Sequence, residues 1–235
     1  VTASGQKTKF LTCERNWVYF TLTAVAGFWG AYTYLLRGNV FCNAQTGNVV
    51  LMAMALGSAK WEEGLYYLIP LSAYILGAFV SELVPNPVKR HLPVRWDTLL
   101  IAIEILAILF LGLLPESAPV QIAQVGINFI ASMQYNTFRI AQGVPMATTF
   151  CTNHLRQTGI ACCKAIRTRD IQHVKRLACH LEMLAVFVAG GVVSTILCRH
   201  FMGRAIWAAL LPLAVVLADL LHADLKGEQA APAKS

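Results

Sequence analysis

The sequence predicts an all-α integral membrane protein, and three observations support this fold class. First, 57% of the 235 residues are hydrophobic and only 13% are charged, whereas soluble domains carry about 25% charged residues. Second, the apolar residues gather in runs long enough to cross a bilayer as helices. Third, the basic residues lie mainly in short segments between these runs. Because backbone groups in lipid must bond to each other, such runs favour helices over loops or open strands.

Six apolar segments are predicted to cross the membrane, since about 20 residues at 1.5 Å per residue span the hydrocarbon layer. They are Trp17–Leu36, Leu65–Val84, Thr98–Leu114, Val120–Ala141, Leu181–Cys198 and Ala205–Leu221. Two further segments, Val40–Ala59 and Val144–Ala165, are apolar but carry polar residues near their starts. We interpret these two as broken or re-entrant segments, and name them the first and second interrupted segments.

The distribution of basic residues decides between six and eight spans, because cytoplasmic loops are enriched in Lys and Arg. With six spans and a cytoplasmic N-terminus, all but four of the 19 Lys and Arg fall on the cytoplasmic side, the four being Arg37, Lys60, Arg199 and Arg204. Eight spans would leave Arg156 inside a helix and turn the loop Lys89–Arg95 outward. We therefore predict a cytoplasmic segment at 1–16, one transmembrane domain at 17–222 and a disordered cytoplasmic tail at 223–235.

The two halves of the domain, 17–114 and 120–222, follow the same plan. Each half has a long apolar segment, an interrupted segment and two more apolar segments. The interrupted segments also resemble each other, although similarity between apolar stretches can arise by chance. Because each half has three spans, the second half would enter the membrane with opposite orientation. Inverted repeats with broken segments in matching positions are typical of secondary transporters.

The motifs in both halves resemble those of the YoaK family. In the first half they are Gly27-Phe28, Ala31-Tyr32-Thr33-Tyr34, Phe41 and Ala44-Gln45-Thr46-Gly47-Asn48-Val49-Val50; in the second half they are Met133-Gln134-Tyr135-Asn136, Ala147-Thr148-Thr149-Phe150-Cys151-Thr152 and Leu155-Arg156. That family comprises uncharacterised bacterial membrane proteins, and the resemblance implies a multi-pass protein of the bacterial inner membrane with about six helices. The chain departs from that family at Gly30, where the family often has an acidic residue. It also departs at Thr152-Asn153-His154, where the family tends to repeat Thr-Gly-Asn.

Polar residues of the interrupted segments are the predicted substrate-binding residues, together with two side chains of the fourth span. They are Asn43, Gln45, Thr46, Gly47, Asn48, Thr148, Thr149, Thr152, Asn153, Gln134 and Asn136. Thr and Asn cap helices, and Gly adopts backbone conformations closed to other residues. A helix that begins within the membrane presents unpaired N–H groups and a positive dipole end, which can hold an anionic group. The alternatives are a structural kink in the interrupted segments and hydrogen bonding between helices for Gln134 and Asn136.

Glu104 is the predicted proton-coupling residue because it lies near the middle of the third span, where an unpaired charge costs several kcal/mol. It should face the interior, be protonated, or pair with a cation such as Arg139. No catalytic set, metal site or cofactor motif is expected, since His154 and His180 lack partners at ligand spacing. The net charge of +7 is attributed to topology rather than to nucleic-acid binding.

The predicted function is therefore a secondary transporter or facilitator of a small polar solute, anions included. Its expected partners are the lipid bilayer and that solute, and a homo-oligomer is left open. The alternative is a membrane scaffold or sensor that docks proteins through its basic cytoplasmic loop. An intramembrane enzyme is the third class, but the sequence offers no catalytic constellation for it.

Overall fold

In the computed structural model, residues 10–85 and 94–227 are described, and nearly all of their regular structure is helical. The helices are η1 (Thr12–Glu14), α1 (Asn16–Leu36), α2 (Gln45–Gly57), α3 (Trp61–Tyr66), α4 (Leu68–Leu83), α6 (Trp96–Leu113), α7 (Val120–Thr137), α8 (Thr152–Thr168), α9 (Ile171–Phe201), η2 (Met202–Ala209) and α10 (Leu210–Leu225). Two short antiparallel strands, β1 (Ile140–Ala141) and β2 (Val144–Pro145), form a hairpin before α8. The all-α prediction is confirmed.

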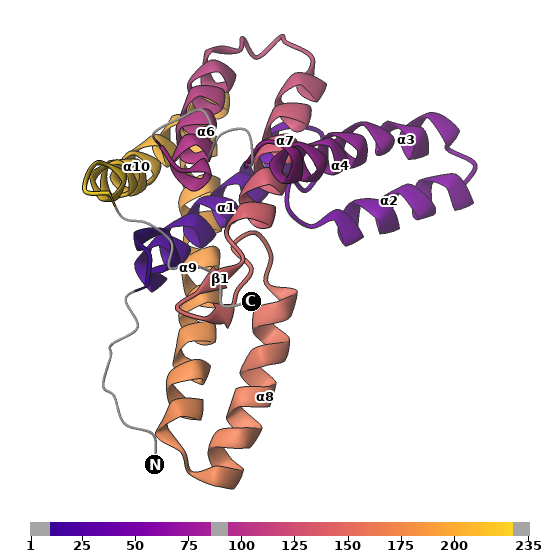
Figure 1. The fold of residues 1–235 in the computed structure, drawn as a ribbon. Coiled ribbons are helices and arrows are strands. Elements are labelled where there is room, and N and C mark those ends of the chain that lie inside the picture. Colours follow the sequence, from indigo (N-terminus) through magenta and orange to yellow (C-terminus); the bar gives the residue numbers. More distant parts are fainter. Residues whose placement is uncertain (1–9, 86–93, 228–235) are drawn as a thin grey trace.

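Two long helix pairs organise the bundle. Helix α1 packs along α9, and α4 packs along α7, while α6 packs against α10 and η2. Helices α2 and α3 extend to one side of this bundle, and α8 with the first half of α9 forms a second projection (Figure 1). The large side chains of Tyr19, Trp29 and Tyr32 on α1 are fully buried, so α1 contributes much of the core.

Glycines bring the backbones of these pairs into direct contact. A Cβ atom at Gly190 of α9 would overlap the carbonyl oxygen of Ala24, and one at Gly27 of α1 would overlap that of Phe187. In the other pair, a Cβ at Gly77 of α4 would overlap the carbonyl oxygen of Phe129. In lipid the hydrophobic effect does not drive helices together, so membrane helices associate through close packing of their backbones at small residues.

Three helical stretches of the described chain are long and apolar enough to cross a membrane. They are Trp61–Leu83, Trp96–Leu113 and the run Ile171–Leu225, which continues through α9, η2 and α10. Their outer faces carry exposed apolar side chains, including Phe79 on α4 and Phe110 on α6. Helices α1 and α7 have sufficient length, but they carry more polar residues and bury many of them inside the bundle. The chain therefore has the features of a membrane protein.

Several predicted boundaries are wrong. The segment Val120–Ala141 does not form one helix, because α7 ends at Thr137 and the chain then enters the β hairpin. The segment Ala205–Leu221 begins in the 3₁₀ helix η2, and α10 continues beyond residue 222 to Leu225. The predicted tail is otherwise outside the described residues, as are residues 1–9 and the basic residues Lys89 and Arg90.

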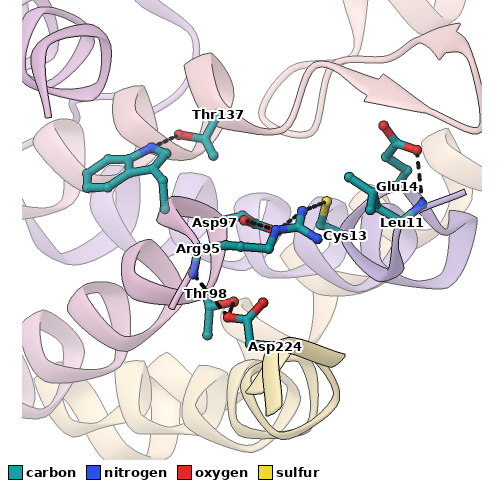
Figure 2. A network of polar contacts seen from close by, with 9 residues as sticks. Leu11, Cys13, Glu14, Arg95, Asp97, Thr98, Thr137 and Asp224 are labelled. Atoms are coloured by element: carbon teal, nitrogen blue, oxygen red, sulfur yellow. Dashed lines mark hydrogen bonds and ion pairs between the residues drawn. The ribbon is translucent and has the colours of Figure 1, made fainter. Parts of the chain in front are cut away.

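A polar network joins the start of α6 to the end of α10 and to the segment before α1 (Figure 2). The Arg95 guanidinium donates to both carboxylate oxygens of Asp97, at 3.1 and 2.8 Å, and to the sulfur of Cys13 at 2.7 Å. Asp224 accepts hydrogen bonds from the Arg95 backbone N–H and from the Thr98 hydroxyl. These contacts hold three segments together that are far apart in the sequence.

Candidate functional site

A pocket of about 690 Å³ brings the two interrupted segments together between α1 and α9. Its lining comprises Gly27, Gly30, Ala31, Tyr34 and Leu35 of α1, Phe41, Asn43 and Ala44 of the first interrupted segment, Thr149, Phe150, Cys151 and Thr152 of the second, and Phe187, Val188, Gly191 and Thr195 of α9. Residues from both halves of the sequence thus share one wall. We call this the central pocket.

The starts of α2 and α8 both open onto the central pocket. Ala44 precedes the first residue of α2, Cys151 precedes the first residue of α8, and both line the pocket. Neither helix start has a side-chain cap, so the Thr46 and Asn48 caps expected from the sequence are not formed. The first N–H groups of a helix have no partner within it, and the helix dipole makes that end positive. An acceptor or anionic group of a ligand would be favoured there.

The side chain of Asn48 hydrogen-bonds within the first interrupted segment. Its fully buried amide donates to the carbonyl oxygen of Phe41 at 2.7 Å and accepts from the Phe41 N–H at 3.0 Å. Gln45 bonds to the Cys42 carbonyl at 3.1 Å and to Asn128 of α7 at 2.8 Å. These side chains form hydrogen bonds within the segment and to α7, and neither of them lines the central pocket.

His154 holds the second interrupted segment in a closely similar way. Its Nε2 lies 2.6 Å from the carbonyl oxygen of Ala147, which is seven residues earlier, as Phe41 is seven residues before Asn48. Its Nδ1 lies 3.0 Å from Nδ1 of His180 on α9, and both rings are almost completely buried. Sequence analysis did not predict this pair, because the two histidines are 26 residues apart and meet only when α8 packs against α9.

Each interrupted segment follows a turn with two consecutive left-handed residues. These are Gly38 and Asn39 in the first half and Gln142 and Gly143 in the second, with φ between 48 and 78°. Glycine's conformational freedom is thus used before the segments rather than at Gly47, which lies within α2. A Cβ at Gly47 would come 3.3 Å from the Phe41 ring, so a larger residue there would require a small shift of that ring.

The remaining predicted binding residues lie away from the pocket lining. Asn136 donates to Ser81 and Glu82 of α4, at 2.9 and 3.3 Å, and therefore joins α7 to α4. Gln134 contacts Thr148 at 3.4 Å, and Asn153 accepts from Arg156 at 3.1 Å. Of the predicted set, only Asn43, Thr149 and Thr152 line the central pocket. The buried Asn43 amide donates to the Ala26 carbonyl of α1 at 3.0 Å.

Aromatic side chains supply most of the pocket features that sequence analysis missed. Tyr34 and Phe41 stack with ring centroids 4.6 Å apart, and Phe150 packs on Tyr135 at 4.8 Å. Three of these four residues line the pocket. Their positions within the family-like motifs were the available signal, but their neighbours in sequence are apolar, so these aromatic residues could not be told apart from core residues.

Glu104 is fully buried in α6, and neither carboxylate oxygen hydrogen-bonds to any described residue. Pairing with Arg139 does not occur, since Arg139 is exposed beyond the end of α7. An ionised carboxylate in such surroundings costs several kcal/mol. Glu104 therefore faces the interior of the bundle, as one of the expected alternatives, and these surroundings favour its protonated, neutral form. Glu104 does not line the central pocket.

A helical bundle whose outer faces carry exposed apolar side chains, with an open pocket lined by residues of both halves, defines a membrane protein with a candidate ligand site. Over residues 18–218 the sequence matches the family described as "Protein of unknown function (DUF1275)". The chain belongs to that family. Neither a curated protein nor a solved structure matches it.

Proposed function

We propose that the protein is a secondary transporter or facilitator of a small solute, which binds in the central pocket. The observation that carries this proposal is that the starts of α2 and α8, one from each half of the chain, open onto the same pocket. Half-helix ends that meet at a midplane site are how many transporters hold their substrates. A scaffold would have no need for such a pocket.

We further propose six spans in two inverted repeats, with both termini in the cytoplasm of a bacterium and the YoaK family as the narrower relationship. Two observations support the repeats. In sequence order, α1 of the first half corresponds to α7 of the second, and α4 corresponds to α9. The packing of α1 on α9 therefore has its counterpart in the packing of α7 on α4. The paired left-handed residues and the seven-residue hydrogen bonds of Asn48 and His154 recur in the same order. Helices α1 and α7 would then be the inner spans, and their polar side chains would bond within the bundle.

The lining of the central pocket narrows the class of solute. Its residues include no Lys, Arg, Asp or Glu, and most of its surface is aromatic or aliphatic. A fully charged polar solute would lose its hydration there without a counter-charge. The uncapped helix starts, with Asn43 and Thr149 beside them, nevertheless suit one acceptor group. We therefore propose a small solute with an apolar body and a single acceptor or carboxylate group.

Glu104 is proposed to couple protons to transport. Its burial without a hydrogen-bond partner among the described residues supports a carboxyl group that gains and loses a proton during a cycle. Glu104→Gln keeps the shape and removes the proton. We expect this variant to bind solute but to lose uptake driven by a pH gradient. Full gradient-driven uptake in Glu104→Gln would remove this role.

The experiment that tests the site compares two adjacent, equally buried threonines. Thr149 lines the central pocket and Thr148 does not, although both have no exposed surface. A metabolite panel is first screened by thermal shift, since a ligand at about 100 times its Kd stabilises by about 2.7 kcal/mol. We expect Thr149→Val to lower the affinity for the best ligand of the panel and to reduce its uptake into proteoliposomes. Thr148→Val should leave both the affinity and the uptake nearly unchanged. Equal effects of the two variants would refute the site.

The alternative function, protein docking, is favoured by one observation. The hairpin of α8 and the first half of α9 projects from the bundle (Figure 1) and exposes Lys164, Arg167, Arg169, Lys175 and Arg176. Helix α9 has 31 residues and so measures about 46 Å, which exceeds the hydrocarbon thickness of about 30 Å. A protein that is well folded but binds nothing in the panel would favour docking through this basic surface.

A further inference from the structure

We infer that His154 is the positioning residue of the second interrupted segment, and that its pairing with His180 makes the pocket wall at Thr149–Thr152 responsive to protons. The inference deepens the proposed function, because it concerns one wall of the central pocket. Its test needs no solute and no transport, so it can fail or succeed independently of that function.

The distances fix the tautomer of each ring. A carbonyl oxygen only accepts hydrogen bonds, so His154 Nε2, at 2.6 Å from the Ala147 oxygen, must carry a hydrogen. In neutral His154 the Nδ1 atom is then bare and accepts from His180 Nδ1, 3.0 Å away. His180 Nε2 is left without a hydrogen. The backbone at Ala147 is thereby connected through His154 to α9.

The pair can hold one extra proton but not two. One proton on His180 Nε2 leaves both hydrogen bonds intact. A second proton would place two N–H donors against each other at 3.0 Å, in a site where the two residues expose only 1% and 3% of their surfaces. The rings must then separate, which moves α8 relative to α9. Since α8 begins at Thr152, this movement displaces the pocket wall.

Neighbouring groups oppose the second proton. Within about one helical turn of either histidine along the chain, the charged and titratable side chains are Arg156 on α8, Arg176, Cys179 and Glu182 on α9, and Cys151 before α8. Arg176 lies one turn before His180 and adds positive charge, whereas Glu182 is exposed at the position two residues after it. Helix α1, which also packs on α9, carries no charged side chain between Asn16 and Leu36.

The first interrupted segment provides a built-in control. Asn48 bonds to Phe41 through a side-chain amide, which does not titrate. The same molecule therefore contains one titratable and one non-titratable version of the seven-residue hydrogen bond. Only the segment held by His154 should respond to pH.

Hydrogen–deuterium exchange tests this on the full-length protein in detergent, between about pH 8 and about pH 5, around the usual histidine range. Exchange is corrected for its intrinsic pH dependence, and protection of residues 146–152 is divided by that of residues 40–46. Linkage to one proton changes an opening equilibrium by up to about tenfold per pH unit. We expect the ratio to fall by about tenfold or more on acidification of the wild-type protein.

His154→Asn copies the arrangement at Asn48, and we expect it to retain protection of residues 146–152 but to abolish the pH response. His180→Gln, which keeps His154 and removes the facing ring, should also flatten the response, and it serves if His154→Asn does not fold. A wild-type ratio that stays constant with pH would overturn the inference. So would a pH response that persists in a folded variant of either histidine.

Discussion

The close backbone contact between α1 and α9 predicts opposite effects of the same substitution at two adjacent glycines. A Cβ at Gly190 would overlap the backbone carbonyl of Ala24, whereas a Cβ at Gly191 would lie 3.6 Å from the Gly27 oxygen, an ordinary contact. Both residues lie inside α9 with ordinary helical φ, and neither begins or ends the helix. Gly190→Ala and Gly191→Ala are therefore a matched pair.

The expected magnitudes follow from two opposing contributions. Alanine in a helix interior is favoured over glycine by about 0.8–1 kcal/mol. Overpacking costs about 1–3 kcal/mol, and at Gly190 the obstacle is backbone, which cannot rotate away, so the upper half of that range applies. We expect Gly190→Ala to destabilise the fold by about 1–2 kcal/mol. Gly191→Ala should be neutral or stabilising by up to about 1 kcal/mol.

Denaturant titration of the purified protein in mixed micelles, followed by circular dichroism, measures both free energies of unfolding. Gly77→Ala provides a second case, since its Cβ would overlap the Phe129 carbonyl of α7. If Gly190→Ala has the same free energy of unfolding as Gly191→Ala, then α1 and α9 do not touch at Ala24. The reasoning on helix pairing would then be refuted.

Two further predictions concern the ends of the bundle. Glu116 accepts from the Gly203 N–H at 2.7 Å and lies 3.9 Å from the buried Arg37; because Glu116 is half-exposed, we expect the hydrogen bond to outweigh the ion pair. Glu116→Ala should thus destabilise by about 1–3 kcal/mol relative to Glu116→Gln, and equal thermal denaturation of the two variants would contradict this. At the other end, burial raises the pKa of the Cys13 thiol despite the adjacent Arg95. Maleimide at neutral pH should therefore modify Cys13 far more slowly than the exposed Cys162, and mass spectrometry of the labelled protein would expose the opposite order.

Hydropathy predicted where several of the long helices lie, because long apolar runs favour helices in hydrocarbon. The expected segments Trp17–Leu36 and Thr98–Leu114 differ from α1 and α6 by at most two residues at either end. The start of the second interrupted segment was not predictable in this way. Val144 and Pro145 are apolar like a span, but the left-handed turn at Gln142-Gly143 pairs them with Ile140 and Ala141 in a hairpin.

The two interrupted segments were recognisable in the sequence, but not which of their side chains line the central pocket. Polar residues within apolar stretches indicated that the two interrupted segments matter, and both line the central pocket. Which polar side chain faces the pocket depends on tertiary partners. Asn48 and Asn43 are five residues apart in one motif, yet the Asn48 side chain hydrogen-bonds to the Phe41 backbone, whereas Asn43 lines the pocket. The His154–His180 contact likewise depends on how α8 packs against α9.

The two interrupted segments share the seven-residue hydrogen bond, but the helices that follow them, α2 and α8, differ in the side chains they carry. This difference indicates which of the two segments would move. Helix α2 exposes Val49, Val50 and Met54, side chains that lipid accommodates and that would resist transfer to water. Helix α8 instead bears basic residues at its far end and projects with α9 from the bundle. Both helices expose apolar side chains, since α8 exposes Leu155, Ile160 and Ile166, but only α8 has a titratable contact at its start, between His154 and His180. We therefore expect the Asn48 segment to act as the fixed side of the pocket and the His154 segment as the movable one.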